Sequence, residues 1–190
     1  TNVPVPYNEP IGTFAPGTPE RAGLEQGLKD LVAITHELPN IIGGKKVMAT
    51  GEKIEVRSPH EHSRVLGVAA NSTHADATSA IAAAKAAAPM WRDLPFDERA
   101  AVILRAADLL SGPWRNKILA ATVWGQSKTA YQAEIDSTCE LIDFWRFNVH
   151  FARQILQEQP VSSPGVWNRT DHRPLEGFVY AITPFNFTAI

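Results

Sequence analysis

Hydrophobic residues recur at helical spacing in several segments, and the strongest of these patterns covers residues 130–158. One apolar row in this segment steps by three or four positions, which is the period of an α-helix. A second row beside it widens the apolar stripe, so we expect a long and largely buried helix. The two rows are Ile135, Cys139, Ile142, Trp145, Val149, Ala152 and Leu156, and Leu141, Phe144, Phe151 and Ile155.

Shorter helices are predicted between residues 19 and 124, separated by proline, glycine and capping residues. Thr73 and Asp76 are placed to cap an alanine-rich helix at its N-terminus. Pro89 and Pro95 are expected to bracket a break in the helical pattern, because proline lacks a backbone donor. The predicted helices cover residues 19–36, 77–88, 97–110 and 113–124.

Strands are predicted between the first two of these helices. Residues 53–57 and 64–69 are expected to pair across the loop between them. Residues 38–47 predict a short strand that turns at Gly43 and Gly44.

The last segment of the chain, residues 178–190, contains no charged residue. Its aromatic and β-branched residues predict a buried strand at 178–183, followed by a turn. Residues 166–173 alternate loosely and predict an exposed strand. We expect the chain to continue beyond residue 190, because a core strand needs elements to cover it. Strands, then helices, then strands predict an α/β protein whose sheet is incomplete.

Composition and charge narrow the class of protein. Hydrophobic residues make up 44% of the 190 residues and charged residues 20%, which suits a folded core rather than a disordered chain. With 18 basic and 20 acidic residues the formal charge is −2, so no general attraction to nucleic acid or anionic membrane is expected. The single cysteine excludes an internal disulfide, and no apolar run approaches the roughly 20 residues of a membrane span.

The first 17 residues contain four prolines and predict an extended arm. They lack the basic region and apolar run that are typical of a signal peptide. We therefore expect a cytoplasmic protein. The mitochondrial matrix stays open as an alternative, since removal of a transit peptide would leave the same sequence.

Few residues qualify as reactive groups from the sequence alone. His60 and His62 could face one side of a strand, but no third ligand is near, so a surface loop is favoured and no metal site is predicted. Cys139 lies on the apolar row of the long helix, where a buried thiol is inert. Glu140 lies between two aspartates, which favours a solvated acidic stripe.

Asn186 is the most informative polar residue and lies in the sequence TPFNFT, residues 183–188. Ligands collect at the strand ends of open α/β sheets. An amide between two phenylalanines needs a hydrogen-bond partner, and in a dry pocket it is a suitable donor to a developing oxyanion. From the residues alone, an asparagine that stabilises the turn is still the favoured interpretation.

Three segments resemble the N-terminal third of NAD-dependent aldehyde dehydrogenases. They are LPFDERAAVILRAADLLSGPWR (94–115), GQSKTAYQAEIDSTCELIDFWRFN (125–148) and LEGFVYAITPFNFTAI (175–190). The last two are similar to the branch, in a bacterial form, that oxidises glutamate 5-semialdehyde to glutamate in proline breakdown. The resemblance implies the N-terminal part of the aldehyde dehydrogenase fold, with helices and the first strands of the cofactor-binding domain.

The resemblance also implies a division of the chain and a set of partners. Residues 1–17 would form the arm, and residues 18–164 the helical and β part of the cofactor-binding domain. Residues 165–175 are a candidate oligomerisation strand, and residues 176–190 hold the first buried strand and the oxyanion turn. The implied partners are NAD, a small-molecule substrate and further copies of the chain, with proline dehydrogenase as a candidate.

Individual residues acquire roles from the same resemblance. Asn186 matches the asparagine that holds the oxyanion formed when a cysteine thiolate attacks the aldehyde. Glu140 matches a glutamate near the substrate, where its carboxylate would contact the substrate ammonium. Phe187 matches an aromatic wall along the substrate stem. The family's nucleophilic cysteine and water-activating glutamate lie in motifs beyond residue 190. The segment that lines the nicotinamide–ribose end of the cofactor site is matched by Ile182, Thr183, Pro184 and Phe185.

Two other functions stay open. A non-catalytic binding or regulatory relative would explain the missing nucleophile, although the uncharged end of the chain would then be sticky. An aldehyde dehydrogenase with another substrate is less well supported, because the motifs around Glu140 and Phe187 are narrow.

Overall fold

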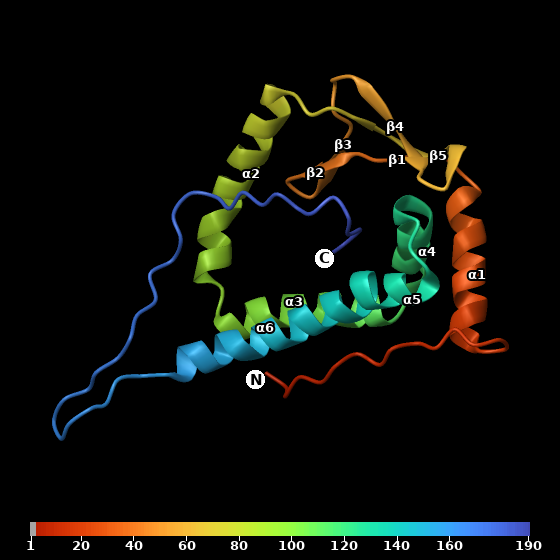
Figure 1. The fold of residues 1–190 in the computed structure, drawn as a ribbon. Coiled ribbons are helices and arrows are strands. Elements are labelled where there is room, and N and C mark those ends of the chain that lie inside the picture. Colours follow the sequence, from red (N-terminus) through yellow and green to blue (C-terminus); the bar gives the residue numbers. More distant parts are fainter. Residues whose placement is uncertain (1–2) are drawn as a thin grey trace.

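Helices and strands surround an open centre in the computed structural model, which describes residues 3–190 (Figure 1). Helix α2 (His74–Asp93) stands on one side, and α1 (Pro19–Val32) and α4 (Arg115–Gln126) stand on the other. The strands close one end, while α3 (Phe96–Ser111) and α6 (Glu140–Gln157) lie across the opposite end. The predicted α/β class is confirmed, and the first two residues of the predicted arm lie outside the described residues.

Helix α1 packs closely against α4, and two glycines allow the approach. A Cβ added to Gly27 would lie 2.9 Å from the backbone oxygen of Asn116, and one added to Gly23 would lie 2.4 Å from the Asn116 side chain. Leu24 of α1 and Leu119 of α4 are buried in one cluster beside this contact. The glycines therefore lower the helix propensity of α1 but let the two backbones meet.

Two small sheets form, largely where the alternating patterns predict them. The exception is β1, because the first predicted helix extends to residue 36, whereas α1 ends at Val32 and His36 pairs with β5. Strands β4 and β5 pair antiparallel, and β1 pairs parallel to the other edge of β5. Strands β2 and β3 form a hairpin that turns at Gly43 and Gly44, both at positive φ. The strands are β1 (His36–Glu37), β2 (Asn40–Ile42), β3 (Lys45–Val47), β4 (Lys53–Ser58) and β5 (Glu61–Ala70).

Helix α2 begins at the predicted cap but ends later than predicted. Thr73 Oγ1 accepts from the Asp76 N–H at 3.3 Å, and the Asp76 carboxylate accepts from the Thr73 N–H at 2.8 Å. The predicted break at Pro89 is wrong, because α2 continues through this proline. A proline removes one hydrogen bond from the helix, and the surrounding alanine-rich sequence tolerates the loss. The break comes only before Pro95.

The long helix predicted at 130–158 is confirmed in extent but not in regularity. Helix α5 (Ala130–Ala133) leads into a π-helical segment, η1 (Glu134–Cys139), which leads into α6. A π turn is wider than an α turn and frees carbonyl groups from their usual partners. The hydroxyls of Ser137 and Thr138 donate to the carbonyls four residues earlier, at 2.6 Å and 2.5 Å.

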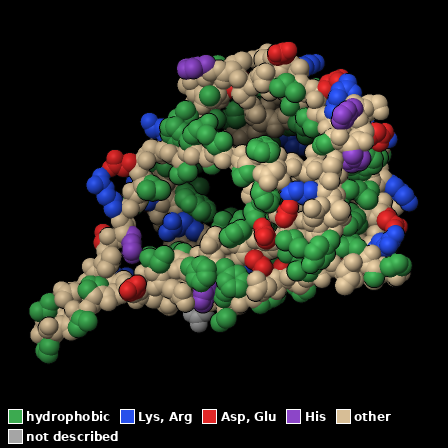
Figure 2. All heavy atoms as spheres, in the orientation of Figure 1, with side chains coloured by type: hydrophobic (Ala, Val, Ile, Leu, Met, Phe, Trp, Pro, Cys, Tyr) green, Lys and Arg blue, Asp and Glu red, His purple; other side chains and the backbone are tan. Residues whose placement is uncertain are grey.

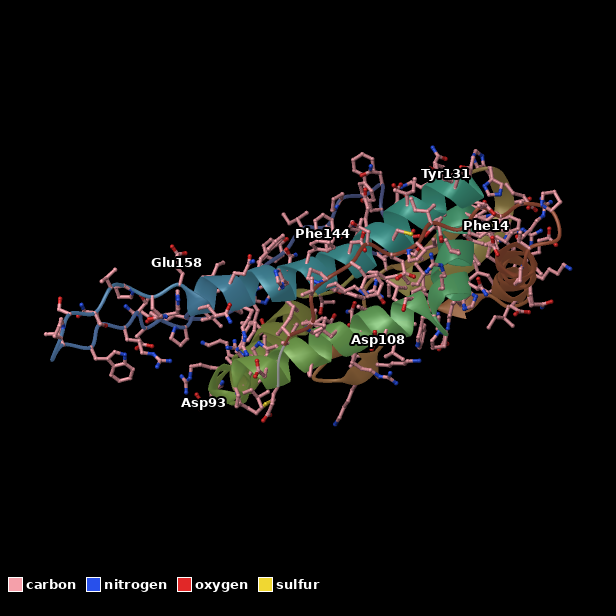
Figure 3. All side chains as sticks on the ribbon, turned by 90° about the horizontal axis from the view of Figure 1, so that it is seen from below. Phe14, Asp93, Asp108, Tyr131, Phe144 and Glu158 are labelled. Atoms are coloured by element: carbon pink, nitrogen blue, oxygen red, sulfur yellow. The ribbon has the colours of Figure 1, made fainter. Side chains whose placement is uncertain are left out.

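The first apolar row of this helix is buried or half-buried, as predicted, and Ile142 packs with Leu110 of α3. The second row is largely exposed, with Phe144, Phe151 and Ile155 at 52%, 49% and 58% exposure. Phe144 lies on the side of α6 away from α3 (Figure 3). Helix α3 covers one face of α6, and no described element covers these three residues.

The C-terminal segment, residues 158–190, differs most from the sequence prediction. In Figure 1 it turns back from the end of α6 and leads toward α4, where Gln126 and Lys128 contact it. No strand forms at 178–183 or within 165–175, and Val179 and Tyr180 are largely exposed. Both sheets consist of β1–β5 alone, so the segment has no strand beside it to pair with. The predicted buried strand and oligomerisation strand are therefore not formed in this structure.

Candidate active site

The C-terminal segment meets the helices at one turn, formed by Phe185 and Asn186. Two side chains at the end of α4 and just after it hold the backbone of this turn. Gln126 Nε2 donates to the Phe185 carbonyl at 3.3 Å, and Lys128 Nζ donates to the Asn186 carbonyl at 2.7 Å. We call residues 185–187 the candidate turn.

Lys128 also contacts two other groups. Its Nζ lies 2.5 Å from Oδ2 of Asp136 on η1, and 4.4 Å from the centre of the Phe187 ring. The side chains of Lys128 and Asp136 are 16% and 26% exposed, so their charges are mostly withdrawn from water. A cation held by a carboxylate, a carbonyl and a ring fixes the turn more firmly than one neutral hydrogen bond would.

The residues predicted to line the cofactor site lead into the candidate turn and lie in the open. Ile182 is 81% exposed and Phe185 is 95% exposed, and Thr183 and Pro184 are exposed as well. The side-chain amide of Asn186 is exposed too, and it makes no hydrogen bond to another group within residues 3–190. Residues 182–186 form one continuous exposed strip, which ends in the side-chain amide of Asn186 that has no hydrogen-bond partner among the described residues.

Glu140 begins α6, one helical turn after Asp136, and its side chain is exposed. Within the part of the chain that the structure describes, this carboxylate has no ion pair or side-chain hydrogen bond. Asp143 instead accepts from the backbone N–H of Glu9 in the arm at 2.7 Å. The expected acidic stripe is thus divided, because Asp136 pairs with Lys128, Asp143 binds the arm, and Glu140 faces water.

Lys128 and Gln126 are the contacts that sequence reasoning missed. Gln126 is the last residue of α4 and Lys128 follows it, in a polar stretch where apolar periodicity carries no information. The one local signal is the capping box of Thr129 and Gln132, which starts α5 directly after Lys128. That signal marks a helix start but does not reveal a partner 58 residues later.

Cys139 is buried, as its place on the apolar row predicts, with 4% of its surface exposed. Its Sγ lies 3.8 Å from the Pro10 carbonyl oxygen and 3.6 Å from Nη2 of Arg115. Burial, and after it the nearby Glu134 carboxylate, raises the pKa of the thiol to about 11. The thiol therefore stays protonated at neutral pH and is a poor nucleophile.

Beside this thiol, four charged side chains that are buried or half-buried hold the N-terminal arm. We call these residues, Glu9, Arg115, Glu134 and Arg146, the arm network. Arg115 pairs with Glu134, and its Nη1 lies 2.6 Å from one oxygen of Glu9. Arg146 Nη1 lies 2.8 Å from the other oxygen of Glu9. The fully buried Glu134 also accepts from the Gly12 N–H at 2.8 Å. Every charge in the network has an opposite partner, which suits a role in fixing the arm.

His60 and His62 are engaged in separate contacts. The Nδ1 atom of His60 lies 2.8 Å from Ser127 Oγ, and its ring stacks on Trp124 with centroids 5.0 Å apart. The Nε2 atom of His62 lies 2.9 Å from the Pro59 carbonyl oxygen. Within residues 3–190, no three His, Cys, Asp or Glu residues are grouped to bind a metal, and no helix has the length and apolar character of a membrane span.

The chemistry of the strip indicates what it could hold. Residues 182–187 carry no charge, and they combine exposed apolar side chains with one free amide. Such a surface offers apolar contacts and one amide to a ligand, and the basic group beside it, Lys128, is already paired with Asp136.

Known proteins match this chain closely over its whole length. The family model described as the aldehyde dehydrogenase family matches residues 46–190. A delta-1-pyrroline-5-carboxylate dehydrogenase of Agaricus bisporus is 44% identical over 190 residues, which covers 99% of this chain and 35% of that protein. The mitochondrial enzyme of the same name from Mus musculus is 46% identical over 183 residues, covering 96% of this chain and 32% of its own length.

A solved structure agrees in both sequence and shape. The crystal structure of the delta-pyrroline-5-carboxylate dehydrogenase from Mycobacterium tuberculosis bound with NAD superposes with a TM-score of 0.96 at 62% identity. The match covers 98% of this chain and 35% of that one. The chain thus spans about a third of the length of the relatives that it matches.

Proposed function

Since this chain belongs to the aldehyde dehydrogenase family, we propose that it is the N-terminal part of an NAD-dependent enzyme that oxidises glutamate 5-semialdehyde to glutamate. The observation that carries the proposal is the candidate turn, where an exposed, uncommitted Asn186 amide follows an uncharged strip. The relatives named delta-1-pyrroline-5-carboxylate dehydrogenase support the substrate, because 1-pyrroline-5-carboxylate is its cyclised form.

In this proposal Asn186 stabilises the oxyanion that develops when a nucleophile attacks the aldehyde carbon. Its side-chain amide has two N–H donors and no charge, so it can stabilise negative charge without giving up a proton. Gln126 and Lys128 hold the backbone of the turn, which reduces the reorganisation that the amide needs during the reaction.

Glu140 and Phe187 contact the substrate. The Glu140 carboxylate is exposed and unpaired, so it is available for a charge-assisted hydrogen bond to the substrate ammonium. Phe187 is half-buried with Lys128 beside its ring, and it offers an apolar wall to the methylene stem.

In this proposal, the nicotinamide–ribose end of NAD contacts four residues before Asn186: Ile182, Thr183, Pro184 and Phe185. When bound, NAD would accept the hydride of the reaction. These four side chains include no titratable group, so their task is to bind and orient the ring rather than to transfer a proton.

Cys139 is not the nucleophile in this proposal. It is buried with a pKa raised to about 11, and its thiol faces the arm rather than the candidate turn. The 190 residues contain no other cysteine, so the attacking thiolate must come from outside them. We therefore expect Cys139→Ser to keep its turnover as long as the protein folds.

Assembly and location are further parts of the proposal. Residues 169–173 are exposed and belong to no sheet. The Thr170 N–H donates to Gln159 Oε1 at 2.8 Å, and the other backbone groups are available to pair with a second copy of the chain. The expected compartment is the cytoplasm, and the mitochondrial relative supports the matrix as the alternative. Proline dehydrogenase is the candidate partner, because it would supply the substrate.

Asn186→Ala tests the role of the candidate turn. In the intact gene product we expect kcat for glutamate 5-semialdehyde to fall by roughly 10²–10³-fold, with little change in NAD affinity, because one oxyanion donor is lost. Asn168→Ala is the matched control, since its amide already bonds the Val161 carbonyl at 2.8 Å in the same segment. Unchanged turnover of Asn186→Ala would refute the role.

The alternatives differ in the substrates that they allow. The proposal predicts a kcat/KM for glutamate 5-semialdehyde far above that for simple aliphatic aldehydes. Equal values would favour an aldehyde dehydrogenase with another substrate. Absence of turnover with every aldehyde would favour a non-catalytic relative.

A further inference from the structure

We propose that Lys128 is a positioning residue for the candidate turn, acting through the backbone of Asn186 and the ring of Phe187. The inference rests on the proposed function, because Lys128 matters for turnover only if Asn186 holds the oxyanion. Lys128 lies 58 residues before Asn186, between α4 and α5, and outside the motif of the turn.

The ammonium of Lys128 has three partners that come from two other segments. It donates to the Asn186 carbonyl at 2.7 Å, pairs with the Asp136 carboxylate at 2.5 Å and lies 4.4 Å from the Phe187 ring centre. An ammonium has three N–H donors and a compact charge, so it can satisfy all three groups at once. One atom therefore ties the loop after α4, the π-helical segment η1 and the candidate turn together.

The contact acts on the atoms that matter for the proposed reaction. The carbonyl that Lys128 binds belongs to the same residue as the amide that would meet the oxyanion. A shift of this backbone moves the amide by a similar distance, and a displacement of about 1 Å can lower a rate on the order of 10²-fold. The second tether, from Gln126, is neutral and longer at 3.3 Å, so it does not replace the first.

Asp136 fixes the position of the Lys128 head group. Without the carboxylate, a lysine side chain would move among several rotamers and hold the turn for only part of the time. Asp136 lies in the π-helical segment η1, which continues directly into α6 at Glu140. The Lys128–Asp136 pair therefore links Asn186 to the helix that carries Glu140, whose carboxylate is proposed to bind the substrate.

Lys128→Met tests the proposal, because it keeps the length of the side chain and removes the ammonium. In the intact gene product we expect kcat to fall about 10- to 100-fold, with KM for NAD unchanged, because the amide of Asn186 is displaced. The matched control is Lys117→Met on α4, where the lysine Nζ lies 4.9 Å from the Trp114 ring centre and does not reach the turn. Wild-type kcat in Lys128→Met would overturn the proposal.

The double variant Lys128→Met/Asn186→Ala separates positioning from general stability. If Lys128 acts through Asn186, the double variant loses no more turnover than Asn186→Ala alone. Losses that multiply would mean that Lys128 acts elsewhere, and would overturn the proposal. Unchanged turnover in Asn186→Ala would instead remove the proposed function itself.

A second variant keeps the proposal testable if Lys128→Met does not fold. Lys128→Arg keeps the charge and the ion pair, but its larger planar head cannot hold the carbonyl and the carboxylate in the same geometry. We expect kcat to fall by about three- to tenfold with NAD affinity unchanged. Wild-type kcat in Lys128→Arg, with Asn186→Ala impaired, would show that the ammonium geometry has no positioning role.

Discussion

The N-terminal arm, residues 3–17, and the C-terminal segment, residues 158–190, both lack helices and strands, yet the helices hold them in different ways. In the arm, the side chain of Glu9 is 9% exposed and is paired with two arginines. In the C-terminal segment, Arg173 and Glu176 pair with each other while 83% and 79% exposed. One irregular segment is fixed by buried and half-buried charges from α4, η1 and α6, and the other lies mostly in water.

The difference shows that a segment without helices or strands can still be held firmly by its contacts with other elements. The arm has no regular hydrogen-bond ladder, but helix side chains take over that task at Gly12 and Glu9. Beyond its start at the end of α6, the C-terminal segment is held by Gln126 and Lys128 at the candidate turn. Figure 2 shows the molecule hollowed beside this segment. A closed contact suits a clamp, whereas an open strip suits a surface that must receive a ligand.

Arg115→Met should give the largest stability effect, because it leaves Glu134 fully buried without its cation. Removal of one partner from a buried ion pair costs about 3–5 kcal/mol. We expect a large fall in the urea midpoint, measured by circular dichroism. Arg21→Met is the control, since its pair with Glu25 is roughly half exposed and should contribute little. Equal midpoints in the two variants would show that the arm network does not fix the arm.

Alkylation of Cys139 should be slow, because the arm covers the thiol and its pKa is raised to about 11 from an ordinary value of 9.0. At pH 8 the thiolate fraction, and with it the rate, should be about 100-fold lower in the folded protein than in the urea-unfolded protein. Peptide mass spectrometry after iodoacetamide treatment reports this site alone. Similar rates in the two states would mean that the arm does not shield Cys139.

The same shift sets the sign of a pH effect on stability. The folded state holds the thiol proton more tightly than the unfolded state. The protonated thiol therefore contributes fully to the free energy of unfolding below about pH 9. It is lost as the pH rises toward about 11, by roughly 1.4 kcal/mol for each pH unit. Cys139→Ser should remove this slope.

Local patterns predicted most of the helices and strands. The capping box of α2, the hairpin at Gly43 and Gly44 and the extent of the helix at 130–157 all follow from spacing and turn chemistry. Pro89 shows the limit of such rules, because the stability of a long alanine-rich helix exceeds the cost of one missing hydrogen bond.

Predictions that depend on a distant neighbour were less successful. Residues 178–183 have the composition of a buried strand, but a strand also needs a partner, and no described strand lies beside them. Phe144 and Phe151 extend an apolar stripe, but whether they are buried depends on what packs against α6.

For the candidate site, motifs identified the residues that would meet ligands but not those that hold them. Asn186 and Phe187 belong to a short contiguous segment, so a sequence motif can mark them. Lys128 acts across 58 residues, and Glu9 and Arg146 meet across 137. Neither contact leaves a periodic or local signal, because each depends on how the helices are arranged in space.

Arg173→Met should give the smallest effect and completes the contrast between the two segments. Its ion pair with Glu176 is the same chemistry as the pairs of Arg115, but the two side chains are almost fully exposed. In water the attraction is screened, and the entropy lost by two long side chains offsets the remainder. We therefore expect no measurable change in the urea midpoint, at low or high salt. A fall comparable to that of Arg115→Met would show that the C-terminal segment is held by its charges as the arm is, and burial would no longer explain why the two segments differ.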